Sequence, residues 1–213
     1  MKNLFKVSAG LINITAAVIL FALMGVNVNA QVSSFLRKDT DGSYRYGVKD
    51  NTGKIIVPPK YDKMGKFCEG LAVVVLNDKY GYIDSTGKEV IPVKYDAARD
   101  FSEGLAIVVR KYDSKCVFID KTGKEITEFK YLPTQTSSFS EGLAKVAKTT
   151  YEQGYIDKTG KEIIPLIYST AYDFEGGKAQ VILDGRKFYI DKTGKEVTKK
   201  GSDSKKINKG GKK

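Results

Sequence analysis

The sequence contains no histidine and no tryptophan, and it has two cysteines among its 213 residues. Without an imidazole, the chain cannot form a Ser-His-Asp or Cys-His catalytic arrangement. It also cannot bind a metal ion through histidine. These absences exclude the histidine-dependent hydrolases and histidine-ligated metal sites.

The part of the chain that can fold also lacks a strong charge of one sign. The formal net charge is +11, but Lys2 and Lys6 supply +2, and residues 199–213 supply +6 from seven lysines and one aspartate. That leaves +3 for residues 31–198. The tail has one apolar residue, Ile207, so we expect it to be disordered and to make weak electrostatic contacts with anionic polymers. We expect no specific nucleic acid recognition.

The N-terminus has the pattern of an export signal. Lys2 and Lys6 precede an apolar run over residues 11–24, which is followed by the small-x-small sequence Val28-Asn29-Ala30. This pattern predicts a signal peptide over residues 1–30 that is cleaved after Ala30, with an uncleaved membrane anchor as the alternative. A secreted, periplasmic or cell-envelope location follows.

The rest of the chain is organised around one short sequence, Asp-x-Thr-Gly-Lys, which occurs five times. Successive copies are 34, 36, 37 and 34 residues apart, which is the period of a supersecondary unit. Glycine reaches positive φ without penalty and aspartate bonds nearby backbone, so each copy is expected to close a hairpin. The predicted structural turn glycines are Gly53, Gly87, Gly123, Gly160 and Gly194.

Each unit is expected to contain three short antiparallel strands. In the second unit, residues 71–76 form a continuous apolar run that indicates the first strand. Residues 80–83 form a second strand with both tyrosines on one face, and residues 89–91 form a short third strand that Pro92 stops. A longer connection then leads into the next unit. The sequence thus predicts an all-β tandem repeat of five units over residues 31–198, either an open twisted array or a propeller-like partial closure.

Large aromatic residues recur at fixed positions of the connections. We expect them to form a packing ladder in which each unit buries its rings against its neighbour, and the alternative is exposed rings that stack on sugars. The positions are Phe67, Phe101, Phe139 and Phe174, and Tyr61, Tyr95, Tyr131 and Tyr168.

The repeated pattern Tyr-Gly-Tyr-Ile-Asp-x-Thr-Gly-Lys-Glu-x-Ile-Pro-x-x-Tyr-Asp, followed by Phe-x-Glu-Gly-Leu-Ala, resembles the WG (or KWG) repeat family of bacterial β-rich arrays. The resemblance covers nearly all of residues 44–198. It implies a surface or envelope binding module and no reaction. The tryptophan of the family is replaced in the five units by Tyr46, Tyr80, Cys116, Gln153 and Lys187, and the glycine after it by Val117 and Phe188 in the third and fifth.

Two sets of recurring carboxylates could form sites. The Asp turns are superficially similar to an aspartic-protease motif and could supply Ca²⁺ ligands, but each turn offers one carboxylate and has a lysine at its fifth position, which repels a cation. Glu69, Glu103 and Glu141 could be read as glycosidase acids. Recurrence favours a structural role for all of them, so we predict no catalytic residue, no cofactor and no metal.

The two cysteines are expected to remain unbonded, although an oxidising compartment would permit a bond. Cys68 precedes the first strand of its unit and Cys116 follows the equivalent strand of the next. They should therefore lie about 20 Å apart at about 3.3 Å per residue, whereas a disulfide needs Cα atoms within about 7 Å.

These observations favour a non-enzymatic binding module that presents a repeated surface to a protein or an envelope polymer. A structural envelope spacer is the alternative, and a hydrolase is the third class. The lysines that end the five turns should form one edge of the array. This candidate binding edge comprises Lys54, Lys88, Lys124, Lys161 and Lys195.

Overall fold

The computed structural model describes residues 32–110 and 115–197, and these residues form strands, turns and loops without a helix. Accordingly, this part of the chain has no helix that could cross a membrane. The predicted signal peptide, residues 1–30, and the predicted disordered tail, residues 199–213, lie outside the described residues.

The strands form five small antiparallel sheets, which we number in chain order. Sheet 1 comprises β1 (Val32–Lys38), β2 (Tyr44–Asp50) and β3 (Ile55–Tyr61). Sheet 2 comprises β4 (Lys63–Cys68), β5 (Leu71–Leu76), β6 (Lys79–Asp84) and β7 (Glu89–Tyr95). Sheet 3 comprises β8 (Ala97–Ala98), β9 (Leu105–Arg110) and β10 (Lys115–Asp120). Sheet 4 comprises β11 (Leu143–Thr149), β12 (Glu152–Asp157) and β13 (Glu162–Tyr168). Sheet 5 comprises β14 (Thr170–Ala171), β15 (Lys178–Leu183), β16 (Arg186–Asp191) and β17 (Glu196–Val197).

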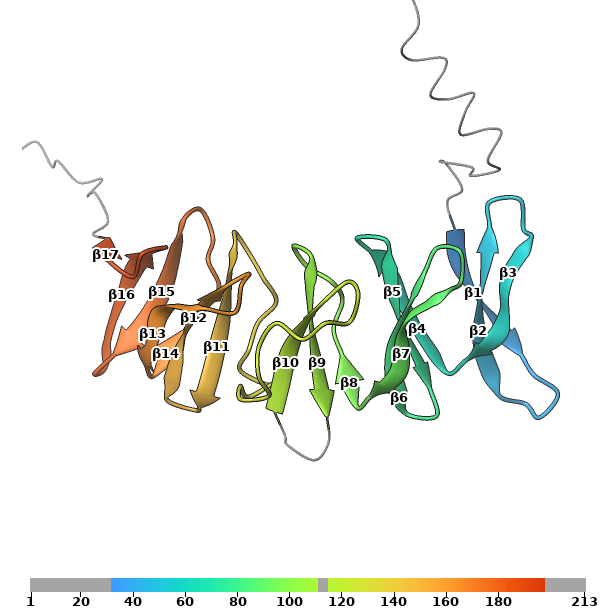
Figure 1. The fold of residues 1–213 in the computed structure, drawn as a ribbon, viewed down its shortest axis with the longest axis horizontal. Helices are drawn as coiled ribbons and strands as arrows, with labels where there is room; N and C mark the ends of the chain where they lie inside the picture. Colours follow the sequence, from blue (N-terminus) through green and yellow to red (C-terminus); the bar gives the residue numbers. More distant parts are fainter. Residues whose placement is uncertain (1–31, 111–114, 198–213) are drawn as a thin grey trace, which may run out of the picture.

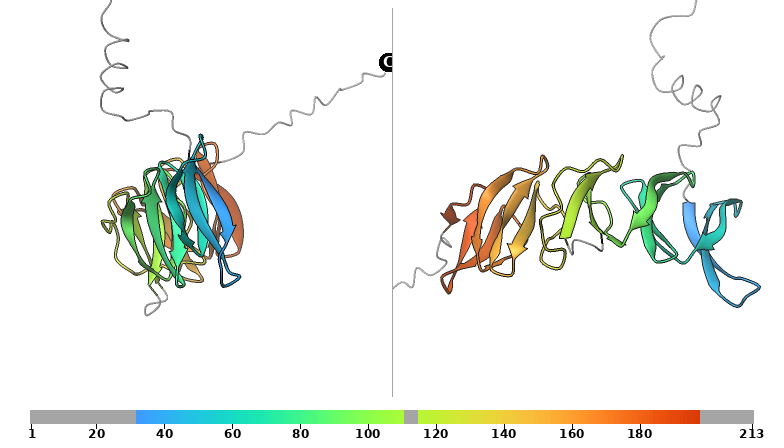
Figure 2. Two further views of the ribbon diagram at one scale, coloured as in Figure 1. Left: turned by 90° about the vertical axis from the view of Figure 1, so that its right-hand side faces the viewer. Right: turned by 60° about the horizontal axis from the view of Figure 1, so that its bottom comes forward.

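The five sheets stack face to face in an open row, with sheet 1 at one end and sheet 5 at the other (Figure 1). The end-on view shows them one behind another (Figure 2). The prediction of an all-β array of five antiparallel units is therefore confirmed. The sequence allowed either an open array or a propeller-like partial closure, and the described residues form the open array.

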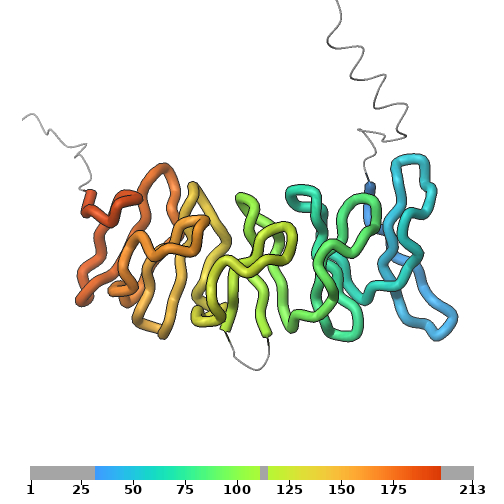
Figure 3. Tube along the Cα trace, viewed as in Figure 1, coloured from blue at the N-terminus to red at the C-terminus, as the bar shows by residue number. Residues whose placement is uncertain are grey.

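The chain passes from one sheet to the next along an almost continuous extended segment (Figure 3). A single residue, Asp62, separates β3 from β4, and Ser169 alone separates β13 from β14. The start of each connection therefore pairs with the first long strand of the following unit, as β4 does with β5. For this reason sheets 2 and 5 have four strands rather than the expected three.

The apolar cores lie between consecutive sheets. Between sheets 2 and 3, for example, Val73 and Tyr82 from one side pack against Val108 and Ile119 from the other. Equivalent clusters fill the other three interfaces. Because the central strands contribute side chains to both neighbouring cores, they are covered on both faces, which explains the uninterrupted apolar run of Leu71–Leu76.

The recurring aromatic residues form the predicted packing ladder. Phe101 of the third unit meets Tyr82 of the second edge to face, with ring centroids 4.9 Å apart. The pairs Phe118–Phe139 and Tyr155–Phe174 repeat this contact at 5.1 and 4.9 Å. The four tyrosines at the recurring position are also buried, which rules them out as an exposed sugar-stacking surface; they are Tyr61, Tyr95, Tyr131 and Tyr168.

The third strand of the second unit does not stop at Pro92, so that expectation was wrong. β7 continues through Pro92 to Tyr95. Tyr80 pairs with Tyr95 and Tyr82 pairs with Ile91, so β7 has two more residues than β6 between these pairs. Pro92 lies in this exposed bulge, where the ladder does not require its missing N–H.

The glycine after the Trp position makes room for this bulge. A Cβ added at Gly81 would lie 2.7 Å from the carbonyl oxygen of Ile91, and one at Gly154 would lie 2.5 Å from that of Ile164. The third unit has Val117 at this position. There the third strand is reduced to two isolated bridges, one of which joins Cys116 to Tyr131. A side chain at this position is thus incompatible with the bulged third strand.

Candidate functional site

Each Asp turn follows the equivalent strand of its unit, which ends at the turn aspartate, and this aspartate organises the turn. In the second unit, Oδ1 of Asp84 accepts hydrogen bonds from Thr86 N at 2.9 Å, Thr86 Oγ1 at 2.6 Å and Lys88 N at 3.0 Å. The other four turns repeat this pattern, with distances within 0.1 Å of these values. Each aspartate is therefore already engaged by its own turn.

These hydrogen bonds hold the turn aspartates in their ionised form. At Asp157 the hydroxyl of Thr159, followed by the backbone N–H groups, lowers the pKa of the carboxyl. At Asp84 partial burial opposes ionisation, but the bonds from Thr86 and Lys88 outweigh it and the pKa is again lowered. A lowered pKa suits a fixed acceptor and does not suit a general acid, which must carry a proton at its working pH.

The predicted turn glycines adopt the conformation that the sequence required. Their φ angles lie between +83° and +89° in all five turns. Gly87 and Gly123 also pack on the preceding sheet. A Cβ at Gly87 would overlap Cγ2 of Val57, and one at Gly123 would lie 3.4 Å from Cγ1 of Ile91. The turns therefore contribute to the contact between units.

Glu69, Glu103 and Glu141, which in sequence resemble hydrolytic acids, join one unit to the next. Glu69 has φ +51° and precedes Gly70 in a tight turn between β4 and β5. Its Oε2 accepts a hydrogen bond from Gly104 N at 2.9 Å, and Nζ of Lys121 lies 3.2 Å from the same oxygen. Two further contacts repeat this arrangement, from Glu103 to Gly142 and Lys158 and from Glu141 to Gly177 and Lys192.

Sequence reasoning missed this Glu–Lys ladder, although the sequence carries a signal for it. The second residue of an Asp turn is lysine wherever the preceding unit supplies a glutamate, as at Lys121. It is Asn51 or Ser85 in the first two turns, for which the described residues of the preceding unit offer no such glutamate. The pairing could therefore have been found by comparing adjacent units.

The lysines of the candidate binding edge end the five turns, one in each sheet. All five side chains are exposed: Lys54, Lys88, Lys124, Lys161 and Lys195. No ion pair within 4 Å involves any of them in the described part of the chain. A glutamate follows four of them, and these glutamates are largely engaged elsewhere, as Glu125 is with Arg110 and Glu196 is with Arg186.

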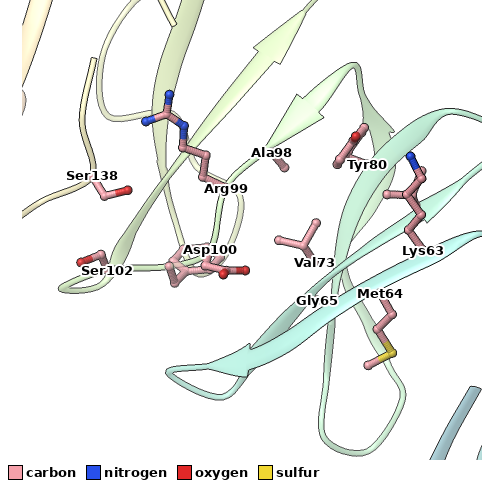
Figure 4. Close-up of a pocket in the computed structure, with 12 residues that line it drawn as sticks. Lys63, Met64, Gly65, Val73, Tyr80, Ala98, Arg99, Asp100, Ser102 and Ser138 are labelled. Atoms are coloured by element: carbon pink, nitrogen blue, oxygen red, sulfur yellow. The ribbon is translucent and has the colours of Figure 1, made fainter. Parts of the chain in front are cut away.

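A second feature is a groove of about 670 Å³ between sheets 2 and 3 (Figure 4). Lys63 and Met64 of β4 line one side, and Arg99, Asp100 and Ser102 line the other. The guanidinium of Arg99 donates hydrogen bonds to the carbonyl oxygens of Thr136 and Pro133 at 2.8 and 2.7 Å, so it holds the next connection in place.

The combination of polar groups in this groove is not repeated along the array. The position of Asp100, just before the recurring phenylalanine, is occupied by a lysine, a serine or an aspartate in other units. The groove also contains Tyr80, which stands at the Trp position of the second unit and packs partly against the core. In the third and fourth units that position holds buried Cys116 and Gln153. The groove is thus specific to one interface.

The remaining polar clusters are small. No group of three or more histidine, cysteine, aspartate or glutamate side chains that could hold a metal ion occurs in residues 32–110 and 115–197. Cys68 and Cys116 are both free thiols. Burial raises the pKa of each thiol, and at Cys68 the neighbouring Asp100 adds to this effect.

Comparison with known proteins identifies the repeat. The family model described as "WG containing repeat" matches residues 46–80, 80–112, 118–148 and 154–186. A search of curated proteins gives no match.

Among solved structures, the chain is similar to a streptogramin B lyase, with 14% identity, a TM-score of 0.38, and coverage of 80% of this chain and 72% of that one. It is also similar to virginiamycin B lyase from Staphylococcus aureus, with 14% identity, a TM-score of 0.37, and coverage of 79% and 73%. A protein of unknown function from Bacteroides caccae gives 13% identity, a TM-score of 0.28, and coverage of 77% and 76%. With TM-scores this low, the likenesses carry no argument about fold or activity.

Proposed function

Because the chain belongs to the family of WG containing repeats, we propose that it is a non-enzymatic binding module that presents one repeated surface to a protein or an envelope polymer. The observation that carries this proposal is the row of five exposed turn lysines without an ion pair in the described residues. The turn aspartates and the Glu-Gly glutamates of the repeat serve the scaffold, whereas these ammonium groups face solvent at equivalent positions of successive sheets.

The geometry suits an extended partner. Sheets packed face to face lie about 10 Å apart, so five units space their turn lysines over about 40 Å. The net charge of residues 31–198 is +3, and each turn lysine has the ionised aspartate of its own turn nearby. Each contact is therefore weak, and useful affinity comes from engaging several units of one polymer at once.

The proposal that the module is not an enzyme rests on the state of its carboxylates. The turn aspartates and Glu69, Glu103 and Glu141 have lowered pKa values in the structure. A glycosidase needs one carboxyl group with a raised pKa to protonate the leaving group. The repeat instead holds these acids ionised, as the contact between units requires.

We further propose that residues 1–30 direct export, so that the array acts in a secreted, periplasmic or cell-envelope location. The lysine-rich residues 199–213 would then add a weak electrostatic contact at one end of the row. The intact mass of the exported protein tests the first statement: an N-terminus at Gln31 supports it, and a chain that keeps Met1 in the cytoplasm contradicts it.

The binding proposal is tested by titrating the full chain with isolated lipopolysaccharide and with envelope polysaccharide at low and high salt. We expect binding at low salt that weakens as salt rises, because exposed charges are screened beyond about 8 Å at physiological ionic strength. Binding that is absent at low salt, or indifferent to salt, would favour the structural spacer instead.

Two variants with equal net charge locate the surface. The first replaces the five turn lysines by glutamine. The second replaces five exposed lysines on other surfaces: Lys38, Lys60, Lys63, Lys66 and Lys94. We expect the first variant to lose most of its affinity and the second to keep most of it. Equal losses would show that only the net charge matters and that the turns do not form the surface.

A further inference from the structure

The same set of polar contacts, which we call the device, joins the sheets at three of the four interfaces. The glutamate of a Glu-Gly turn accepts a hydrogen bond from the backbone of the equivalent turn in the next unit and pairs with a turn lysine, as Glu69 does with Gly104 and Lys121. In two of them a serine hydroxyl also donates to the next phenylalanine carbonyl, as Ser102 does to Phe139 at 2.8 Å. A preceding unit thus offers a carboxylate and a hydroxyl to the following one.

The first interface lacks this device within the described residues. Sheet 1 has the strand order β1-β2-β3, and β1 is its outer strand. β1 is equivalent to β5, because Val32 pairs with Asp50 as Leu71 pairs with Asp84. In sheet 2 the strand β4 pairs with the outer edge of β5, but no described strand pairs with the outer edge of β1. Among the described residues, the row therefore begins with a seven-residue strand whose outer edge has no partner.

A groove lies where a strand equivalent to β4, with its turn, would contact sheet 2. It measures about 500 Å³ and is lined by Val32 and Ser33 of β1, Asn51, Phe67, Gly70 and Ser85. Gly70 has φ +90°, the same as Gly104. Gly104 N binds the carboxylate of Glu69, whereas Gly70 N has no partner among the described residues.

The other two positions that take part in the device, those of Ser85 and Phe67, also line this groove. Ser85 occupies the turn position that holds Lys121 in the next unit. The carbonyl oxygen of Phe67 corresponds to that of Phe139, which accepts the hydroxyl of Ser102. The groove therefore contains the groups that a preceding unit would contact. At the other interfaces the described preceding unit supplies the groups that make this contact.

We propose that the edge of β1 binds an extended segment of a partner protein, which adds as a fourth strand of sheet 1 and places an acidic side chain against Gly70 N and Ser85. Strand addition supplies backbone hydrogen bonds along β1, and the carboxylate supplies selectivity. The segment runs antiparallel to β1, as β4 runs to β5. It resembles the chain's own Phe-Ser-Glu-Gly segments in chemistry. This site is independent of the five turn lysines.

A partner segment fits better than the two occupants that the chain itself could provide. The residues directly before β1 are Ala30 and Gln31, which correspond to Glu69 and Gly70 and supply no carboxylate. In a second copy, β4 and β14 are already paired with β5 and β15. That copy could offer such a segment only by opening one of its own sheets.

The probe is a labelled peptide with the sequence of residues 97–104, Ala-Ala-Arg-Asp-Phe-Ser-Glu-Gly. Binding is followed by fluorescence anisotropy, with the full chain and with the chain after removal of residues 1–30, which retains every described strand. We expect saturable binding and protection of the β1 amides from hydrogen exchange. A peptide with glutamine in place of its glutamate should bind more weakly.

Two substitutions at Ser85 make the test specific. This turn position holds asparagine, serine or lysine in the five units, so it tolerates change. Ser85→Lys should tighten peptide binding by about two- to fivefold and Ser85→Glu should weaken it by a similar factor, as expected for a partly exposed ion pair. The glutamine peptide should not respond to Ser85→Lys.

Several outcomes would overturn the proposal. One is an absence of binding to both forms of the protein. Another is an affinity that does not change with the substitutions at Ser85 and at the peptide glutamate. Binding only after removal of residues 1–30 would assign the edge to the chain's own preceding segment, and self-association that competes with the peptide would assign it to a second copy. The variant that lacks the turn lysines should lose polymer binding and still bind the peptide. The two proposals can therefore be refuted independently of each other.

Discussion

The turn glycines permit a sharp test of how each unit packs on the one before it. Gly53 and Gly87 have nearly equal φ angles, +89° and +83°. A Cβ at Gly53 meets nothing within 4 Å, whereas one at Gly87 overlaps the side chain of Val57. Gly53→Ala therefore reports backbone strain alone, and Gly87→Ala reports strain together with a steric conflict.

The magnitudes follow from these two terms. A non-glycine residue in the left-handed region costs about 1–2 kcal/mol, so Gly53→Ala should lower the free energy of unfolding by that amount. Overpacking adds about 1–3 kcal/mol, so Gly87→Ala should cost about 2–5 kcal/mol. Gly87→Val and Gly123→Val are expected to be destabilising as well, because a β-branched residue resists positive φ.

Removing the obstructing side chain should relieve the conflict. Val57→Ala deletes buried methyl groups and costs about 2 kcal/mol by itself. In that background Gly87→Ala should cost only the strain, so the double-mutant cycle should show coupling of about 1–3 kcal/mol. Urea unfolding of the four proteins, followed by circular dichroism, gives the values. Equal costs for Gly53→Ala and Gly87→Ala, or coupling below about 0.5 kcal/mol, would refute the packing of the turn on Val57.

Three further outcomes are expected. Phe139→Ala should cost about 3–5 kcal/mol in chemical unfolding because Phe139 is buried against Phe118, whereas Tyr151→Ala, at a side chain that is 73% exposed, should change stability by less than about 0.5 kcal/mol; similar effects of the two would contradict the aromatic ladder. The lowered pKa of Asp157 means that its stabilising effect is present above the ordinary carboxyl pKa and is lost as pH falls through the lower folded value. The unfolding free energy should therefore drop as pH falls below the ordinary carboxyl pKa, and less so in Asp157→Asn; equal acid sensitivity would count against the turn carboxylate. Cys116 is fully buried and should react with a thiol reagent only on unfolding, and an intact mass two units below that of the dithiol would show a disulfide that the structure does not contain.

The repeat and its turns could be predicted from the sequence because their determinants are local. The glycine of Asp-x-Thr-Gly-Lys requires positive φ, and the aspartate needs only acceptor geometry within five residues, so the hairpin is fixed wherever that sequence occurs. The same holds for the continuous strand Leu71–Leu76, whose apolar side chains on both faces indicate two covering layers.

The features that could not be predicted depend on contacts between units. Pro92 stops a regular strand, but β7 passes it in a bulge whose room is provided by Gly81 on the neighbouring strand. Glu69 resembles an available acid in sequence, and only the approach of Gly104 and Lys121 from the next unit shows its role. Likewise, the edge of β1 that has no partner among residues 32–110 and 115–197 is recognised only by comparison with β5, which pairs with β4 at the equivalent edge.

The most direct measurement for the proposed function restores the turn lysines one sheet at a time in the variant that has glutamine at all five positions. Affinity for one linear anionic envelope polymer is measured at low salt for zero to five restored lysines. If the array presents a repeated surface, the logarithm of the association constant should rise by similar steps with each restored lysine, and more when restored lysines occupy adjacent sheets. An affinity that depends on one lysine alone, or that does not change across the series, would contradict the account.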